Sequence, residues 1–210
     1  IPLVVIGAAL LWFGWFGFNA GSGLAADGLA VSAFLATHLA TATAAFSWAL
    51  LDWKLNGKPT TIGICTGAVA GLVAITPAAG FVGVLGSVSI GIIVAVVCFF
   101  MVSVVKHKFG YDDSLDAFGV HGIGGIIGAI LTGVFATPAI QSSYSGLLSG
   151  NVKQLGIQLI ATVTTIIFSG IMTYILYKVV DGMVGIRATQ KEEIAGLDIT
   201  QHNEMALSED

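Results

Sequence analysis

Charged residues are scarce in this sequence. Asp, Glu, Lys and Arg make up 10% of the 210 residues, whereas hydrophobic residues make up 56%. A soluble domain carries roughly a quarter charged residues, so this chain has too few of them to cover a surface that faces water. The composition excludes a soluble globular protein and predicts a protein that lies in a lipid bilayer. We expect no nucleic-acid partner.

Cysteine is also rare. The chain has two copies, Cys65 and Cys98, and each lies within an apolar run. Neither the number nor the spacing fits a disulfide framework or a metal site. We therefore expect both to be small buried hydrophobic residues, and we expect the protein to use no cofactor.

The chain lacks an initiator Met and a basic leader. A secretory signal peptide would show a positively charged start and a shorter apolar core. Segment 1–20 is instead typical of a membrane helix entered almost at its beginning. The expectation is that the chain is part of a larger protein, or a processed piece of one.

Six apolar runs are long enough to cross a bilayer, which takes about 20 residues. The alternating pattern of a membrane barrel is absent, so the runs are predicted to be helices that satisfy their own backbone hydrogen bonds. The predicted spans are roughly 2–22, 29–51, 61–82, 84–105, 115–136 and 155–180. The predicted fold is an all-α polytopic membrane protein with a membrane region, 1–180, and a tail, 181–210.

The cations are distributed unevenly between the predicted connections. Seven of the eight Lys and Arg residues fall on one side of the membrane, and only Lys153 falls on the other. Positively charged connections usually face the cytoplasm. Both ends of the chain are therefore predicted to be cytoplasmic, in a multi-pass protein of the plasma membrane.

Glycines recur at intervals of four inside two predicted spans. Gly63, Gly67 and Gly71 form one series, and Gly124 and Gly128 form another. Small residues at this spacing allow helix backbones to approach closely in a membrane. The pattern predicts a tightly packed bundle and does not identify a function.

His121 lies in an unusually polar stretch, 112–125, at the start of the fifth predicted span. A helix that starts near Ser114 would place it about 10 Å deep in the membrane, where ionisable groups are costly and usually face a cavity or a partner. One interpretation is a neutral imidazole that hydrogen-bonds to another helix. The glycines around His121 favour a second, in which the ring faces a space that a ligand enters.

Asp113 and Asp116 precede this histidine. Asp113 is well placed as an N-cap, and Asp116 then falls in the first turn, where a negative charge complements the helix dipole. We prefer this capping interpretation near the pore to a catalytic carboxylate pair. His38, which shares its helix with Thr37 and Thr41, is predicted to make a structural contact between helices.

The first span ends in a run of aromatic and small residues. Trp15, Phe18 and Ser22 recur at helical spacing and are predicted to share one face. Aromatic side chains at a span's end usually form an interfacial belt, and this is the favoured interpretation. The alternative is a face that binds a small cation, because aromatic rings attract cations.

The tail 181–210 holds seven of the twelve acidic residues. It is too short and polar to form a domain of its own. It is either a solvated tail or a docking segment for a cytoplasmic partner.

Several blocks of the sequence closely resemble the Amt branch of the ammonium transporters. These blocks are segments 15–22, 67–78 and 112–122, and segment 185–202 resembles the cytoplasmic end of that family. The resemblance implies eleven spans and a homotrimer of separate pores that conduct ammonium, ammonia or the analogue methylammonium. This chain would then supply spans six to eleven, the second of two inverted halves, and would need the missing N-terminal half.

The resemblance also implies roles for individual residues. Ser22 would belong to the outer site that recruits ammonium, and Phe18 would be one of two rings that close the pore. His121 would be one of two paired pore histidines, with Trp15 near them. The resemblance implies that a PII-type signal protein docks on the tail. This tail departs from the family pattern at 205–207.

Three rival functions follow from the same residues. An ammonium sensor would share the fold, but the expectation from the short tail is a transporter. Ser22 argues against a gas channel of the Rh kind. An intramembrane hydrolase with Ser22 as nucleophile and His121 as base is the remote alternative, because the Gly-x-Ser-Gly pattern would need Gly where Ala20 stands. We expect a transporter and not an enzyme.

Overall fold

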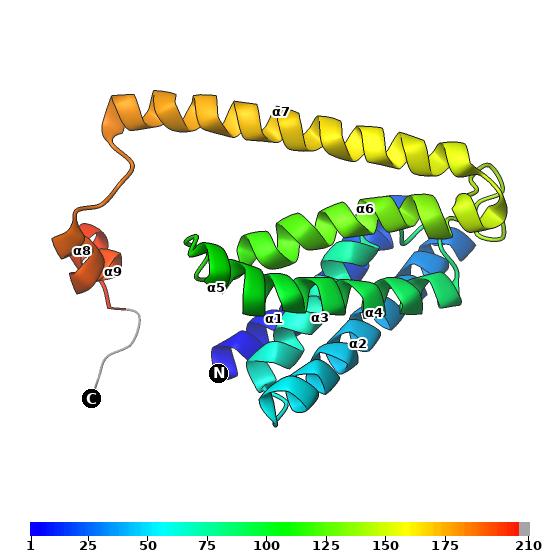
Figure 1. Ribbon diagram of the computed structural model, residues 1–210, viewed down its shortest axis with the longest axis horizontal. Coiled ribbons are helices and arrows are strands. Elements are labelled where there is room, and N and C mark those ends of the chain that lie inside the picture. Colours follow the sequence, from blue (N-terminus) through cyan, green and yellow to red (C-terminus); the bar gives the residue numbers. More distant parts are fainter. Residues whose placement is uncertain (206–210) are drawn as a thin grey trace. The chain divides into compact units, whose positions relative to one another are not determined.

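Helices account for the regular structure of residues 1–205, which the computed structural model describes, and this range contains no strand. The chain divides into two compact units, Ile1–Thr162 and Val163–Asp210. The helices are α1 (Pro2–Asn19), α2 (Gly28–Asn56), α3 (Thr61–Ile75), α4 (Val84–Phe100), α5 (Lys106–Phe109), α6 (Ile123–Phe135), α7 (Val152–Val184), α8 (Gln190–Ala195) and α9 (Leu197–His202) (Figure 1).

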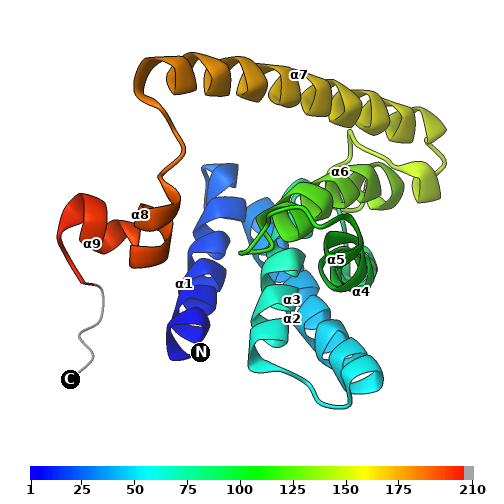
Figure 2. The same cartoon turned by 60° about the vertical axis from the view of Figure 1, so that its left-hand side comes forward.

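Helix α2 is the centre of the first unit. Helices α3 and α4 pack along it, α6 packs on both of these, and α1 lies beside α3 and α2 (Figures 1 and 2). The face of α2 that enters the core carries small residues at helical spacing, including Ala33, Ala40 and Ala44. Helix backbones that carry such residues approach closely, which increases the dispersion contacts between them.

The glycine series predicted from the sequence lies at these contacts. A β-carbon placed on Gly71 would lie 2.8 Å from the carbonyl oxygen of Ala40, and one on Gly67 would lie 2.5 Å from Cβ of Trp48. A β-carbon on Gly91 of α4 would also lie 2.5 Å from the oxygen of Ala40. Two helices therefore approach the same carbonyl of α2. The prediction of close helix packing is confirmed.

The second glycine series brings α6 against α3. A β-carbon on Gly128 would overlap the backbone of Ala74, and one on Gly124 would contact Val73 and Cys98. Cys98 is fully buried and Cys65 is partly buried, and both thiols are free. The expected burial is confirmed for Cys98 and holds in part for Cys65.

A buried carboxylate joins α2 to α3. Asp52 is 5% exposed and accepts hydrogen bonds from the Thr60 hydroxyl (2.8 Å) and from the Asn56 amide (3.1 Å). The oxygen of the Thr60 hydroxyl also accepts the N–H of Gly63, and so caps α3. Because the buried charge is bonded on both oxygens, the connection between the two helices has a defined geometry.

Within residues 1–205, five helical segments are long and apolar enough to cross a membrane. They are Pro2–Gly23, Gly28–Asn56, Val84–Phe109, Phe118–Phe135 and Val152–Val184. The third predicted span forms the shorter helix α3, whose 15 residues extend about 22 Å. It stops at Ile75 because Pro77 lacks the N–H that would continue the helix, and turns replace the predicted helix as far as Phe81. The predicted count of six spans stays a proposal.

The second unit continues α7 and ends in α8 and α9. A capping box begins α8: the Thr189 hydroxyl accepts the N–H of Glu192, and the Glu192 carboxylate accepts the N–H of Thr189 at 2.8 Å. Arg187 pairs with Glu193 at 2.7 Å. The sequence predicts that the tail departs from the family pattern at 205–207. Positions 206 and 207 lie outside the described residues.

The capping box predicts a pH response of α8. Hydrogen bonds from the hydroxyl and the backbone of Thr189 lower the pKa of Glu192 below its ordinary value of 4.5. The stabilisation of α8 is therefore fully present above pH 4.5 and is lost as the pH falls through the lowered pKa. Thr189→Val should raise the pKa of Glu192, measured by carboxyl NMR in the full chain. Thr200→Val in α9 is the control, and an unchanged titration in Thr189→Val would refute the coupling.

Candidate functional site

The end of α1 gathers the aromatic and hydroxyl residues that the sequence placed on one face. The rings of Trp15 and Phe18 meet edge to face, with centroids 5.7 Å apart and planes at 90°. The hydroxyl of Ser22, in the 3₁₀ turn Gly21–Gly23, donates to the carbonyl oxygen of Phe18 at 2.5 Å. The rings of Trp15 and Phe18 therefore share the predicted face, and the place of Ser22 on that face stays a prediction. Phe18 is 58% exposed on this chain.

Trp15 is held by a residue of α3. Its indole Nε1 donates to Oγ1 of Thr76 at 2.7 Å, and the Thr76 hydroxyl donates to the carbonyl of Leu72. A Trp that hydrogen-bonds at one end keeps its ring orientation. The end of α1 is therefore tied to the end of α3.

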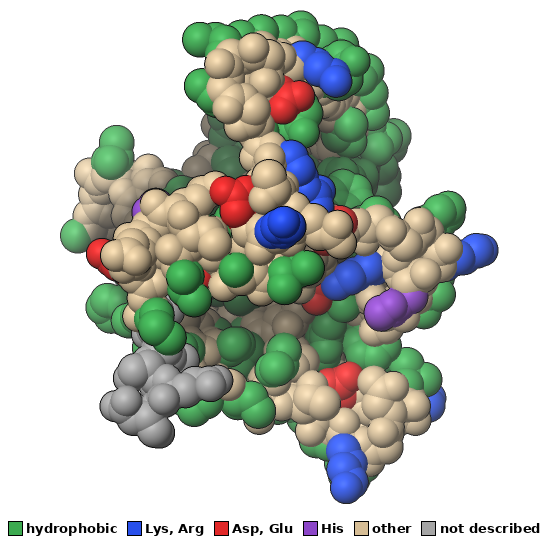
Figure 3. Space-filling model, turned by 90° about the vertical axis from the view of Figure 1, so that its left-hand side faces the viewer, with side chains coloured by type: hydrophobic (Ala, Val, Ile, Leu, Met, Phe, Trp, Pro, Cys, Tyr) green, Lys and Arg blue, Asp and Glu red, His purple; other side chains and the backbone are tan. Residues whose placement is uncertain are grey.

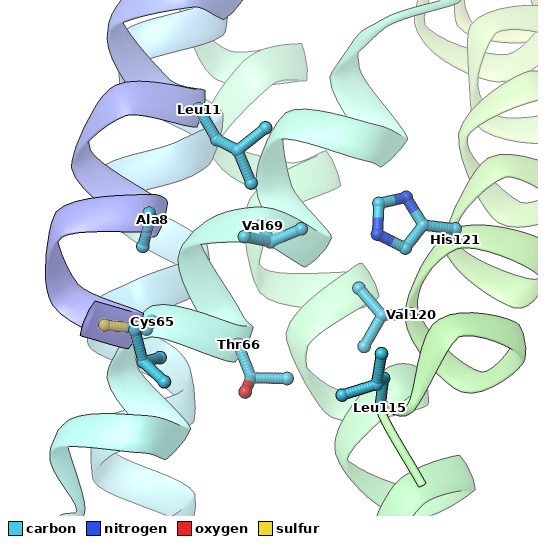
Figure 4. Close-up of a pocket in the computed structure, with 10 residues that line it drawn as sticks. Ala8, Leu11, Cys65, Thr66, Val69, Leu115, Val120 and His121 are labelled. Carbon is cyan, nitrogen blue, oxygen red and sulfur yellow. The ribbon is translucent and has the colours of Figure 1, made fainter. Parts of the chain in front are cut away.

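His121 faces a cavity between α1, α3 and the segment before α6. The cavity has a volume of about 280 Å³. In Figure 4 the imidazole lies across from Leu11 and Val69. The imidazole makes no hydrogen bond to any group in residues 1–205. The interpretation in which it hydrogen-bonds to another helix therefore has no support within these residues. The lining residues are Val4, Gly7, Ala8, Leu11, Cys65, Thr66, Val69, Leu115, Val120 and His121.

The helix that carries His121 starts later than the sequence predicted. Regular π-helical structure begins at Phe118 and continues into α6, so the expected start near Ser114 is wrong. Residues 113–116 form a turn, closed by the N–H of Asp116 bonding to the carbonyl of Asp113. His121 therefore lies in the first helical turn, and the sequence overestimated its depth along the helix.

Asp113 still meets the first amides of the helix, from a greater distance along the chain. Its carboxylate accepts the N–H of Phe118 at 3.0 Å and that of Gly119 at 3.2 Å. Those amides have no partner within the helix, and a negative charge complements them. Asp113 is not the N-cap residue itself, because a turn separates it from the start of the helix. The turn places its side chain over the helix end.

Asp116 does not lie in the first turn, which corrects its predicted position. Its backbone is left-handed, with φ 55°, and its carboxylate pairs with Lys106 at 2.7 Å. The pair links α5 to the turn before His121. Asp113 is thus bonded to amides and Asp116 to a cation, which agrees with the preference for a structural role over a catalytic pair.

His38 contacts aromatic rings rather than a hydrogen-bond partner. Its ring centroid lies 5.4 Å from that of Trp12 and 6.1 Å from that of Phe16. The polar link between α1 and α2 runs instead from Asn19 Nδ2 to Thr37 Oγ1 at 3.0 Å. The predicted contact between helices exists, but Thr37 supplies its hydrogen bond.

A second cavity lies beside Ser22. It has a volume of about 190 Å³, and its polar lining residues are Asn19, Ser22 and Gln141. Sequence reasoning missed Gln141, because this residue belongs to the connection between α6 and α7, far from Ser22 along the chain. The connection reaches the cavity because the N–H of Thr137 bonds to the carbonyl of Phe81 at 2.9 Å.

Cations gather at the opposite end of the first unit. The last turn of α2, which carries Lys54, the α2–α3 connection, which carries Lys58, and helix α5, which carries Lys106 and Lys108, lie at one end of the bundle (Figure 1). Blue Lys and Arg side chains are visible on the face of the molecule that Figure 3 shows. No group of three or more His, Cys, Asp or Glu side chains in residues 1–205 is arranged to hold a metal ion.

Comparison with known proteins decides the family. The model of the Ammonium Transporter Family matches residues 1–207. The chain belongs to the ammonium transporter family. It is 53% identical to an ammonium transporter of Aquifex aeolicus over 208 residues, which are 99% of this chain and 49% of that protein. The family consists of transporters and not enzymes, as predicted.

Solved structures of the family share the fold. Mep2 of Saccharomyces cerevisiae superimposes with a TM-score of 0.84 at 35% identity, over 90% of this chain and 44% of that one. A structure described as a sensor Amt protein gives 0.86 at 30% identity, over 95% and 49%. The chain spans about half the length of the relatives that it matches.

Proposed function

We propose that this chain supplies half of a pore that moves ammonium nitrogen across the plasma membrane. Ammonium is recruited beside Ser22 and transfers its proton to water, and ammonia then passes Phe18 and hydrogen-bonds to a neutral His121, while the proton crosses separately along the histidines or a chain of waters. The observation that carries the proposal is the imidazole of His121, which faces a cavity bordered by α1 and has no hydrogen-bond partner in residues 1–205. The same helix carries Trp15 and Phe18 toward Ser22.

The hydrogen bonds of Ser22 suit a cation. Its hydroxyl proton is donated to the Phe18 carbonyl, so the lone pairs of its oxygen remain to accept an N–H of ammonium. The nearby rings of Trp15 and Phe18 add attraction for a positive charge. A bare ammonium ion is expensive to place in hydrocarbon, so it gives up its proton before it passes Phe18.

The membrane arrangement is part of the proposal. Six spans, with the short α3 as the third, form the second inverted half of an eleven-span fold. Both ends of the chain are cytoplasmic, since Lys54, Lys58, Lys106 and Lys108 lie at one end of the first unit. The N-terminal half supplies the second pore histidine, the protein is a homotrimer, and the tail 181–210 is a docking segment for a PII-type protein.

The rival functions are less well supported. A sensor function shares the fold with one solved relative, but the curated relatives that match at higher identity are named transporters. Ser22 continues to argue against the Rh-type gas channel. A hydrolase is disfavoured because Ser22 and His121 line different cavities, and the Ser22 hydroxyl donates to a backbone carbonyl rather than to an imidazole.

Ser22→Ala should weaken uptake at low ammonium concentration. A hydrogen bond to a charged group contributes about 1.5 kcal/mol, so its loss should raise the KM for methylammonium about tenfold. The measurement is labelled methylammonium uptake by the full-length transporter. Ser143→Ala, at an exposed serine of the α6–α7 connection, is the matched control. Unchanged uptake at low concentration in Ser22→Ala would count against recruitment at this residue.

A further inference from the structure

We propose that Gln141 is a second recruiting residue for the transported cation. It lines the cavity beside Ser22 together with Asn19, and the three side chains form a site for ammonium or a small primary alkylammonium ion. The inference rests on the proposed function, because it assigns an additional ligand to the recruiting end of the same path. The observations that support it concern Gln141, which belongs to the connection between α6 and α7 rather than to the end of α1.

The cavity is lined by three side chains that each carry a hydrogen-bond acceptor oxygen. The Ser22 hydroxyl donates to Phe18, and the Asn19 amide nitrogen donates to Thr37. Each side chain therefore keeps an oxygen that accepts. The side-chain amide of Gln141 has no hydrogen-bond partner within residues 1–205 and adds a third acceptor oxygen. Ammonium has four N–H donors and no acceptor, so a site of several acceptors is complementary to it.

The rest of the lining favours a small cation over an anion. No Lys, Arg or His borders the cavity, and Phe81 contributes an aromatic ring. Such a ring attracts a positive charge. The remaining walls are apolar or small, with Leu29, Ala30 and Ala33 from α2, and the volume of about 190 Å³ accommodates a methyl group on the nitrogen. The site therefore suits methylammonium as well as ammonium.

The backbone at Gln141 is held in place before any ligand arrives. It lies in a turn in which its N–H bonds to the carbonyl of Thr137 and its own carbonyl accepts the N–H of Tyr144. The Tyr144 ring packs edge to face on Phe81, with centroids 5.2 Å apart. The turn is thus braced against another residue of the same cavity. Such preorganisation reduces the entropy lost when a ligand binds.

The test compares Gln141→Leu and Gln141→Glu in the full-length transporter. Leu keeps a similar volume but removes the acceptor, and the KM for methylammonium uptake should rise about tenfold with an unchanged maximal rate. Glu keeps the acceptor and adds a negative charge, so the KM should fall at neutral pH. Gln154→Leu, a glutamine of α7 that lines a different cavity, is the control and should behave as wild type.

The two variants separate a ligand role from a structural one. A structural role predicts that Leu and Glu shift uptake in the same direction, whereas a ligand role predicts opposite shifts in KM. A wild-type KM in Gln141→Leu overturns the inference, and so does a loss of maximal rate at unchanged KM. Ser22→Ala, measured in parallel, tests recruitment at Ser22 by itself, because that variant leaves Gln141 in place.

Discussion

Transport currents are expected to disappear, or to change in character, when His121 is replaced by Ala. The imidazole faces the cavity between α1 and α3 and is bound to no described residue. Its removal takes the imidazole out of a lining whose other members are mostly apolar. Ammonia would then lose its hydrogen-bond partner there, and any proton carried with the nitrogen would lose an acceptor.

The measurement for His121 is the transient current of the full-length transporter on supported membranes after an ammonium jump. His107→Ala is the control, since His107 is an exposed residue of α5. Protein abundance in the membrane is measured alongside, so that a folding defect is recognised. Currents of wild-type size and ammonium dependence in His121→Ala would refute a role for this histidine in the pore.

A large loss of stability is expected when Gly128 is replaced by Ala. A β-carbon at this position overlaps the backbone of Ala74, which cannot move away as the end of a flexible side chain would. Helices α3 and α6 must separate or shift, and overpacking of this kind costs about 1–3 kcal/mol, occasionally more. Cys65, Thr66 and Val69 line the His121 cavity from α3, so the same shift should impair transport.

The control for Gly128 is Gly156→Ala in α7. A β-carbon on Gly156 meets no atom within 4 Å, and both substitutions gain the same helix propensity. Thermal unfolding in detergent should show a lower midpoint for Gly128→Ala and no decrease for Gly156→Ala. Equal midpoints for the two variants would show that α6 accommodates the extra carbon.

The helix packing could be predicted from the sequence because it depends on local spacing. Gly63, Gly67 and Gly71 lie on one helix face whatever the rest of the chain does, and the structure places that face against α2. The contact between the rings of Trp15 and Phe18 follows from the same periodicity. Prediction from the local sequence failed at the turn 113–116. The left-handed backbone of Asp116 belongs to this turn, so the helix begins after the two carboxylates that predicted its start.

The sequence by itself determined that the protein lies in a lipid bilayer, that its fold is all-α, and which family it resembles. Few charges, long apolar runs and blocks of characteristic residues are properties of the chain that need no partner segment. Only the tertiary structure decided that Thr37 bonds to Asn19, that Lys106 pairs with Asp116, and that Gln141 reaches the cavity beside Ser22. These contacts join residues that periodicity does not relate, so only the packed fold brings them together.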